Sequence, residues 1–265
     1  MNVNIADLFS VKGKVVLVTG GSRGIGEMIA TGFVQAGAKV YISSRSAKAC
    51  DETAARLTAL GPGQCFALPA DLQKIEDIKH LVQEFGKLED HLDVLINNAG
   101  ATWGAPLDEY PDNAFQKVMN LNVNRIFTLT QAFIPHLKAK ATQDSPSRVI
   151  NIGSIAGIVA PKYENYAYSA SKAAIHHLTR HLSGRMGKQH ILVNAIAPGS
   201  FQSKMMAETL KNFGDQIVQG IPTGRIGTPE DIVGTCIYLS SRAGQYTLGA
   251  VIVVDGGAIQ NTARI

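Results

Sequence analysis

Short runs of apolar and β-branched residues alternate with longer amphipathic stretches along the whole chain. The short runs show no clean apolar–polar alternation, which is typical of parallel strands covered on both faces. We predict strands at Val15–Val18, Val40–Ser43, Cys65–Leu68, Val94–Ile96, Arg148–Ile152, Ile191–Ile196 and Val251–Val254.

Helical periodicity fills the intervals between these runs. One helix face is shared by Ile75, Ile78, Val82 and Phe85,. A second, longer helical pattern is formed by Phe115, Val118, Met119, Ile126, Phe133 and Leu137. Gly37 is expected to end the first helix just before the second strand.

Strand–helix alternation without a repeat or a linker predicts an α/β fold in a single domain, residues 1–265. We expect a doubly wound, Rossmann-type parallel sheet of about seven strands with helices on both faces. The least regular stretch, residues 200–227, follows the sixth strand, and we expect it to form a mobile substrate lid,.

Composition excludes several classes of protein. The net charge is only +4, and lysines and arginines are scattered, so no nucleic-acid partner is expected,. The apolar runs are far shorter than the ~18 residues that span a bilayer, and the first residues lack the order of a signal peptide. We therefore expect a cytoplasmic protein without a membrane partner. Cys50, Cys65 and Cys236 lack metal-ligand spacing and are expected to be reduced thiols, with no metal bound,.

The segment T-G-G-S-R-G-I-G lies between the first predicted strand and the first predicted helix. Gly20 would let the chain turn sharply, while Gly24 and Gly26 would allow a pyrophosphate to approach the backbone and the helix N-terminus,. A glycine-rich turn that merely connects strand to helix is the alternative. The position in the first strand–helix turn favours a dinucleotide site.

The end of the second strand indicates which dinucleotide is bound. NAD sites usually carry an acidic residue here, but this chain has Ser44 followed by Arg45,. Arg45, with Arg23 in the glycine turn, could bind a 2′-phosphate, so we predict NADP(H) as the cofactor. The alternative is a pair of solvated surface arginines.

Tyr168 and Lys172 are spaced to lie on one face of a helix. Free tyrosine has a pKa near ~10, and we expect the neighbouring ammonium to lower it enough for acid–base chemistry,. Ser154 follows the fifth strand, where its hydroxyl could hold a substrate oxygen. The alternative is an ordinary surface Tyr–Lys pair. His176, with its neighbours on the same helix, is expected to be a packing or solvent residue.

The glycine turn and the Ser154, Tyr168 and Lys172 set resemble those of the short-chain dehydrogenase/reductase family. The resemblance covers essentially the whole chain, because four further motifs follow the family order: D-L at Asp71–Leu72, N-N-A-G at 97–100, P-G-x-x-x-S at Pro198–Ser203 and V-D-G-G at Val254–Gly257. The resemblance implies catalysis by Ser154, Tyr168, Lys172 and Asn122, with Asn120 and Asn124 as competing positions for the last. It implies cofactor binding by Gly20, Ser22, Arg23, Gly24, Ile25, Gly26, Ser44, Arg45, Asp71, Leu72, Asn98, Ala99, Gly100, Tyr168, Lys172, Pro198, Gly199 and Ser203.

Within the family, NIGSIAG, APGSFQSKM and GRIGTPEDI are most similar to 3-oxoacyl reductases. NNAGATWGAPLDEYP and RVINIGSIAGI resemble in particular those of the rhamnolipid type. The implied substrate is a small carbonyl or alcohol, with an acyl thioester as one form, and the implied assembly is a homotetramer. The extra residue between Ser154 and Tyr168 and the different lid depart from the acyl-carrier-protein reductases. A polyol, sugar-acid or small-ketone enzyme and a non-catalytic NADP-binding regulator remain the alternatives. Trp103 is expected either to line the substrate mouth or to pack in the core.

Overall fold

The computed structural model describes residues 4–203 and 206–261. Its strands form one parallel sheet in the order β3-β2-β1-β4-β5-β6-β7. They are β1 (Val15–Thr19), β2 (Lys39–Ser43), β3 (Gln64–Ala67), β4 (Val94–Asn97), β5 (Ser147–Ile152), β6 (Ile191–Pro198) and β7 (Val251–Val254). All seven predicted strands are confirmed, with small differences at their ends.

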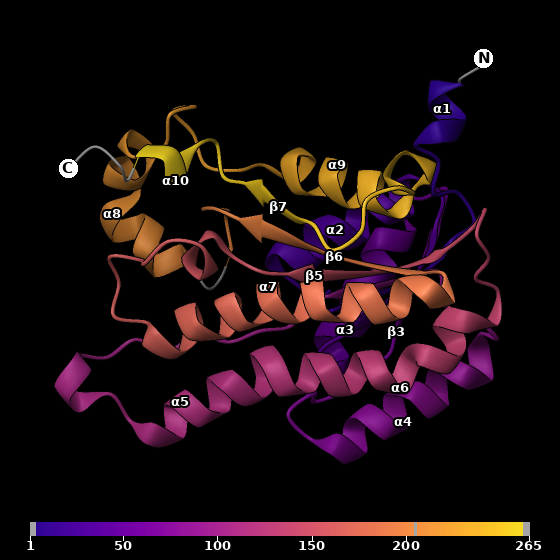
Figure 1. Cartoon of the computed structure of the whole chain (residues 1–265), viewed down its shortest axis with the longest axis horizontal. Coiled ribbons are helices and arrows are strands. Elements are labelled where there is room, and N and C mark those ends of the chain that lie inside the picture. The colour runs from indigo at the N-terminus through magenta and orange to yellow at the C-terminus, as the bar shows by residue number, and fades with distance from the viewer. Residues whose placement is uncertain (1–3, 204–205, 262–265) are drawn as a thin grey trace.

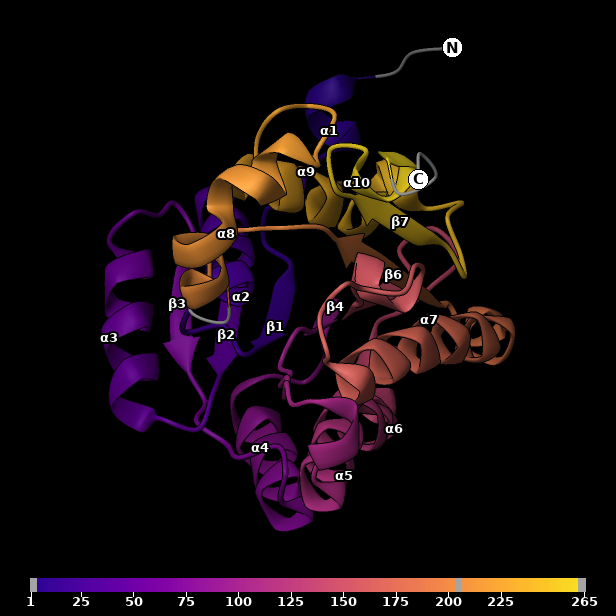
Figure 2. The same ribbon diagram turned by 90° about the vertical axis from the view of Figure 1, so that its left-hand side faces the viewer.

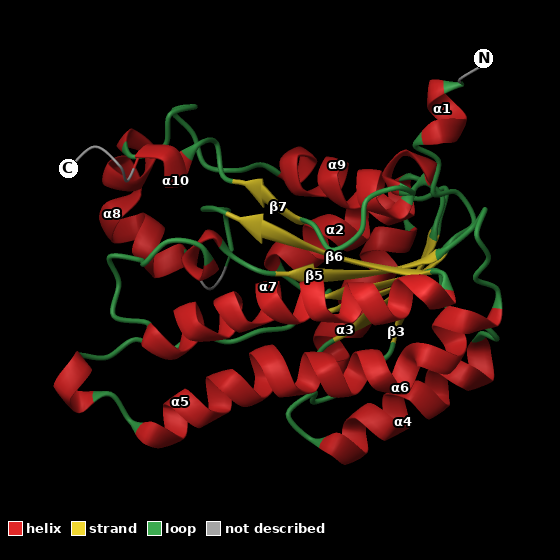
Figure 3. Ribbon diagram, viewed as in Figure 1, coloured by secondary structure: helices red, strands yellow, loops and turns green. Residues whose placement is uncertain are grey.

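Helices cover both faces of this sheet (Figures 1 and 3). They are α1 (Ile5–Leu8), α2 (Gly24–Gln35), α3 (Ala47–Thr58), α4 (Ile75–Leu88), α5 (Asp112–Met119), α6 (Arg125–Ala139), α7 (Tyr166–Met186), α8 (Ala207–Gln219), α9 (Pro229–Ser240) and α10 (Ala258–Asn261). The doubly wound architecture is the predicted one.

The sheet separates two apolar cores. On one face, Phe33 of α2 and Ile232 of α9 pack against β1, β4 and β6; on the other, Phe85 of α4 and Phe133 of α6 meet edge-on. Each large side chain buried in this way contributes roughly 1.5–3 kcal/mol. Because each strand packs against a core on both of its faces, its sequence is a continuous apolar run.

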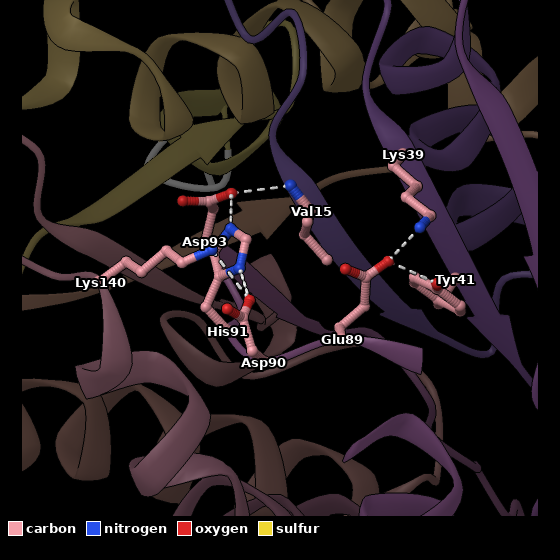
Figure 4. A network of polar contacts seen from close by, with 8 residues as sticks. All are labelled: Val15, Lys39, Tyr41, Glu89, Asp90, His91, Asp93 and Lys140. Carbon is pink, nitrogen blue, oxygen red and sulfur yellow. Dashed lines mark hydrogen bonds and ion pairs between the residues drawn. The ribbon is translucent and has the colours of Figure 1, made fainter. Parts of the chain in front are cut away.

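Polar contacts hold the amino ends of the strands (Figure 4). The Asp93 carboxylate, just before β4, accepts a hydrogen bond of 2.8 Å from the backbone N–H of Val15. Glu89, after α4, accepts from the Tyr41 hydroxyl at 2.6 Å and pairs with the Lys39 ammonium at 2.5 Å. The first contact joins the start of β4 to β1, and the second joins the end of α4 to β2, both at the edge opposite the candidate site.

Nearly half of the segment predicted as an irregular lid is helical. Residues 207–219 form α8, in which Phe213 leaves helical geometry and no side chain is fully buried. The expectation of an irregular segment is therefore wrong for residues 207–219, where the helical spacing of Leu210 and Ile217 is the signal for a helix. Residues 204–205 of the predicted lid lie outside the described residues.

Candidate active site

The glycine turn connects the end of β1 to α2. Gly20 and Gly24 adopt the left-handed φ values of 66° and 55°, which favour glycine,. A Cβ on Gly26 would lie 2.3 Å from the Gly20 carbonyl oxygen, so only glycine lets the helix pack this closely on the turn. Ile25 is partly buried and packs against the core beside the sheet, so its side chain anchors the turn. The turn stands at the carboxyl edge of the sheet, the edge that faces the viewer in Figure 2.

The first turn of α2 has the properties of an anion site. Its N-cap residue, Arg23, makes no side-chain capping hydrogen bond, so the first backbone amides have no side-chain acceptor there,. Arg23 and Arg45 are exposed, and neither forms a side-chain hydrogen bond or ion pair within the described part of the chain. Both guanidinium groups are therefore available to an added phosphate.

Ser44 follows β2 at the position where NAD sites carry an acid. Its hydroxyl accepts a hydrogen bond of 2.9 Å from Ser22 and lies 3.0 Å from the Cys50 sulfur. This contact joins the glycine turn to the end of β2. The residue before Arg45 therefore offers a hydroxyl group in place of the acid.

In the candidate cofactor set, the side chains of Asn98 and Asp71 form hydrogen bonds with the backbone. The Asn98 side chain donates to the carbonyl oxygens of Thr19 at 2.8 Å and Gly20 at 3.3 Å. The backbone N–H groups of Asn98 and Ala99 both donate to the Thr19 hydroxyl at 3.0 Å. After β3, the Asp71 carboxylate accepts from the Gln73 backbone at 3.1 Å. Leu72 is buried in the core.

Ser154, Tyr168 and Lys172 come together where β5 ends and α7 begins. Ser154 follows β5, and its hydroxyl forms a hydrogen bond with the Tyr168 hydroxyl while accepting from the Ala156 backbone at 3.1 Å. The Lys172 ammonium lies 5.5 Å from the centre of the Tyr168 ring. It donates to the Ile152 carbonyl oxygen at 2.8 Å. The predicted shared face of the helix is confirmed.

The predicted effect on the Tyr168 pKa is wrong in direction. Burial raises the pKa of Tyr168, and the hydrogen bond from Ser154 lowers it only in part,. Burial also lowers the pKa of Lys172 to about 8. The ammonium is held against a backbone carbonyl, so the loss of water around the phenol outweighs its attraction. Tyr168 is therefore a protonated acid at neutral pH.

Asn122 lies in a segment whose conformation the sequence did not predict. Residues Asn120–Asn124 form a π-helix between α5 and α6, and Asn122 within it is fully buried. Its amide donates to Ala101 O and Ser171 Oγ, both at 2.9 Å, and accepts from Ala101 N at 2.9 Å. Of the three candidate asparagines, only this one reaches both the turn after β4 and α7. π-Helical turns are frequent at functional sites.

A model of the family described as short chain dehydrogenase matches residues 14–213. This match covers the glycine turn, the N-N-A-G segment and the Ser154–Tyr168–Lys172 cluster. The chain belongs to the short-chain dehydrogenase family.

Known short-chain dehydrogenases resemble the chain over nearly its full length. The rhamnolipids biosynthesis 3-oxoacyl-[acyl-carrier-protein] reductase of Pseudomonas aeruginosa is 47% identical over 94% of this chain and 97% of its own. The 2-dehydro-3-deoxy-D-gluconate 5-dehydrogenase of Escherichia coli is 36% identical over 96% of this chain and 98% of its own.

Solved structures of short-chain dehydrogenases also match. The Pseudomonas aeruginosa RhlG/NADP active-site complex superposes with a TM-score of 0.91 at 47% identity, covering 95% of this chain and 98% of its own. A gluconate 5-dehydrogenase from Burkholderia cenocepacia, in complex with NADP and tartrate, has a TM-score of 0.90 at 28% identity. It covers 97% of this chain and 99% of its own.

The predicted lid of this short-chain dehydrogenase begins beside the glycine turn. Pro198 ends β6, and the Gly199 backbone N–H donates to the Val254 carbonyl of β7 at 2.9 Å. Ser203 lies so close to Gly24 that a Cβ there would sit 3.2 Å from the Ser203 Cβ. A cleft of about 450 Å³, lined by both residues, separates α2 from the first residues of the lid.

The structure tests the predictions made for Trp103 and His176. Trp103 is 50% exposed, so the core alternative is wrong. His176 is buried as a packing residue would be, but it also accepts a hydrogen bond from the Ser154 backbone. His177 and His181 are exposed. Sequence reasoning missed the polar contact of His176, although its spacing of four from Lys172 placed it on the same helix face.

The cysteines, the possible metal ligands and the longest helices were also the subject of predictions. The three cysteines are free and buried in the core. Residues 4–203 and 206–261 contain no group of three or more His, Cys, Asp and Glu side chains that could hold a metal ion. Among the described helices, none is both long and apolar enough to cross a membrane.

Proposed function

We propose that this chain is an NADP(H)-dependent 3-oxoacyl reductase, which converts a 3-oxoacyl carbonyl to the alcohol. The observation that carries the proposal is the hydrogen bond between Ser154 and Tyr168 beside the buried ammonium of Lys172. A hydroxyl pair next to a cation at the carboxyl edge of a parallel sheet suits transfer of a proton to a carbonyl oxygen.

The residues at the glycine turn fit NADP(H). The first turn of α2 has no side-chain cap, Ser44 replaces an acid, and Arg23 and Arg45 have no carboxylate partner in the part of the chain described. These groups would hold the phosphates, with the remaining contacts from the other candidate cofactor residues after β3, β4 and β6. When bound, NADP(H) supplies or accepts the hydride at the carbonyl carbon. The same dinucleotide is named for the P. aeruginosa and B. cenocepacia structures.

The side chains then divide the proton chemistry. Tyr168, kept protonated by burial, donates its hydroxyl proton to the substrate oxygen, which Ser154 orients,. Lys172 stabilises the phenolate as it forms, and its ammonium is a proton source close by,. Asn122 keeps the Ala101 turn and Ser171 of α7 at a fixed separation.

Apolar and aromatic side chains close to Tyr168 favour an apolar substrate; we call this group, Trp103, Leu107, Tyr110 and Tyr166, the mouth of the site. Leu107 and Trp103 are 70% and 50% exposed, and the ring of Tyr110 meets that of Tyr166 at 5.6 Å, two residues before Tyr168. The Tyr110 hydroxyl donates to the Trp103 carbonyl at 3.1 Å, which ties the mouth together. Exposed apolar side chains of this kind suit an acyl chain. The 47% identical relative is named as a 3-oxoacyl reductase.

A sugar-acid dehydrogenase is the second candidate, because two of the matched relatives act on gluconate derivatives according to their names. A non-catalytic NADP-binding regulator is disfavoured, since a pure binder has no use for the Ser154, Tyr168 and Lys172 set. The lid role of residues 200–227, the homotetramer and the cytoplasmic location stay predictions.

A substrate panel tests the proposal. Purified protein with NADPH should oxidise the cofactor fastest with 3-oxoacyl thioesters, more slowly with small ketones, and least with 5-ketogluconate. Faster turnover of the keto-sugar acid would replace the proposal with the second candidate. Binding of NADPH without turnover of any carbonyl in the panel would favour the regulator.

A further inference from the structure

His176 continues the polar face of α7 that carries Tyr168 and Lys172. The three residues are spaced by four, so they stack along one side of the helix,. Its side chain is only 3% exposed. A buried histidine two turns below the proposed acid is not used by the chemistry described above.

The His176 ring touches the segment that carries Ser154. Its Nε2 accepts a hydrogen bond of 3.5 Å from the Ser154 backbone N–H, and the ring also forms a hydrogen bond with the backbone of Gly157. A Cβ on Gly153 would lie 2.1 Å from Nε2, so only glycine leaves room for the ring. The ring thus contacts the turn of residues 153–157 at its start, at Ser154 and at its end.

The ring must be neutral to accept from Ser154, which places its proton on Nδ1. Burial, together with the positive charges of Lys172 and Arg180, lowers the pKa of His176 to about 4, although the Gly157 backbone opposes this. The acceptor state is therefore present throughout the neutral and alkaline range.

α7 holds the chain on both sides of Ser154. The Lys172 ammonium donates to the Ile152 carbonyl at 2.8 Å, and His176 accepts from the Ser154 N–H two residues later. The Ser154 hydroxyl in turn bonds to Tyr168. The backbone that sets the position of this hydroxyl is therefore fixed to the same helix as the phenol.

The geometry points to His176 as a positioning residue, which holds the Ser154 main chain so that its hydroxyl stays in hydrogen-bonding contact with Tyr168. This inference rests on the proposed function, because it assigns a purpose to the Ser154–Tyr168 contact. It predicts that removing the acceptor on His176 weakens catalysis through Ser154 while cofactor binding at the glycine turn is kept.

Three substitutions of His176 separate the effect of losing its hydrogen-bond acceptor from the effect of changing its side-chain volume. His176→Gln places an acceptor oxygen at about the reach of Nε2, His176→Asn has the same amide on a shorter stem, and His176→Leu fills space without an acceptor. We expect kcat to fall about 10–100-fold in the Leu and Asn variants and to recover to within a few-fold in Gln. The NADPH dissociation constant, measured by fluorescence, should change less than about threefold in all three, which also reports that each variant is folded.

The pH profile gives a readout that loss of packing alone would not move. The Ser154 hydrogen bond lowers the pKa of Tyr168, so its loss should shift the rising limb of alcohol oxidation to higher pH by about 0.5–1 unit,. Lys172 faces both Tyr168 and His176, and Arg180 faces His176, and these charges remain in every variant. The shift is expected in Leu and Asn and absent in Gln.

A double-mutant cycle tests whether the loss of kcat in His176→Leu acts through the Ser154 hydroxyl. In a Ser154→Ala background, His176→Leu should cost less than about twofold more in kcat, because there is no hydroxyl left to position. Additive losses, an unshifted pH profile in His176→Leu, or a Gln variant as slow as Leu would each overturn the inference. If the wild-type protein turns over no carbonyl, the proposed function fails; if it does and these variants match it, only the role of His176 fails.

Discussion

Lys172 is a buried lysine whose ammonium donates to the Ile152 carbonyl oxygen beside the Tyr168 ring. Burial lowers its pKa to about 8, from 10.5 in water,. Between these two values the unfolded chain binds more protons than the folded one, so stability rises as the pH increases from about 8 to about 10.5. Below about pH 8 the cost of the buried charge is present in full.

The cost of this charge leads to a prediction for Lys172→Met. At pH 7 the variant should unfold with a free energy higher by roughly 1–3 kcal/mol, because the cost of the buried charge is removed and only one carbonyl oxygen, that of Ile152, loses its donor,. Carbonyl reduction should fall by at least about 100-fold. Urea unfolding and NADPH oxidation measure the two effects, with exposed Lys188→Met as the control. A variant that is both less stable and fully active would contradict this account of Lys172.

Arg45 carries the prediction on cofactor choice. Arg45→Asp should weaken NADPH binding about 10–100-fold, the loss of a charge-assisted contact, and leave NADH binding equal or tighter. Fluorescence titration of both dinucleotides measures this, and Arg185→Asp on the exposed end of α7 is the charge-matched control. Wild-type affinity for NADPH no higher than for NADH, or insensitive to the substitution, would refute the assignment of the 2′-phosphate site.

Residue identities could be predicted at this site better than residue environments. The spacing of Tyr168 and Lys172 was sufficient to place them on one helix face, because helical geometry is local. The sign of the Tyr168 pKa shift depends on how much water the folded chain excludes, which no local pattern reports. The contact between His176 and Ser154 joins residues 22 apart and was missed for the same reason.

At the scale of elements, the π-helix at Asn120–Asn124 interrupts a helical pattern that the sequence predicts as continuous. The extra residue in that turn rotates the helix relative to an uninterrupted one, which brings Asn122 between Ala101 and Ser171,. Apolar periodicity is nearly the same on either side of such a turn, so it gives little warning. The first turns of α4 and α5 also differ from expectation, with Ile75 and Phe115 exposed by 43% and 38%.

Arg148 connects β5 to the end of α9. Its buried guanidinium donates to the carbonyl oxygens of Leu239 at 2.9 Å and Ser241 at 3.2 Å, and also to Pro146. Arg148→Met would leave these buried carbonyls without a donor, so the free energy of unfolding should fall by about 2–4 kcal/mol.

Urea unfolding followed by circular dichroism measures this loss. Arg148→Lys should recover little of it, because one ammonium cannot reproduce the planar fork of donors. A Met variant within about 0.5 kcal/mol of the wild type would show that α9 and β5 are held by apolar packing alone.

At the scale of the molecule, the seven-stranded parallel sheet could be predicted almost completely. Strands buried on both faces are continuous apolar runs, and the crossover rule fixes how they connect,. The lid could not be predicted in the same way. α8 has no fully buried side chain, so the sequence carries a weak apolar signal there.

The last strand bears on the predicted oligomeric state. β7 pairs only with β6 among the described strands, and Val253 on it is 36% exposed, so one sheet edge is open for a second copy,. With the family resemblance, we expect a homotetramer of about 113 kDa from chains of 28.2 kDa. Light scattering after size-exclusion chromatography measures this mass. A mass near that of one chain would contradict the tetramer.

In the proposed reaction, a buried, protonated phenol at position 168 delivers the proton to the carbonyl oxygen. Tyr168→Phe removes one oxygen atom and should leave the NADPH dissociation constant within about threefold of the wild type. The most direct measurement is the steady-state rate of 3-oxoacyl thioester reduction by this variant. We expect a fall of about 100- to 10,000-fold. Reduction by Tyr168→Phe at a rate within tenfold of the wild type would contradict it.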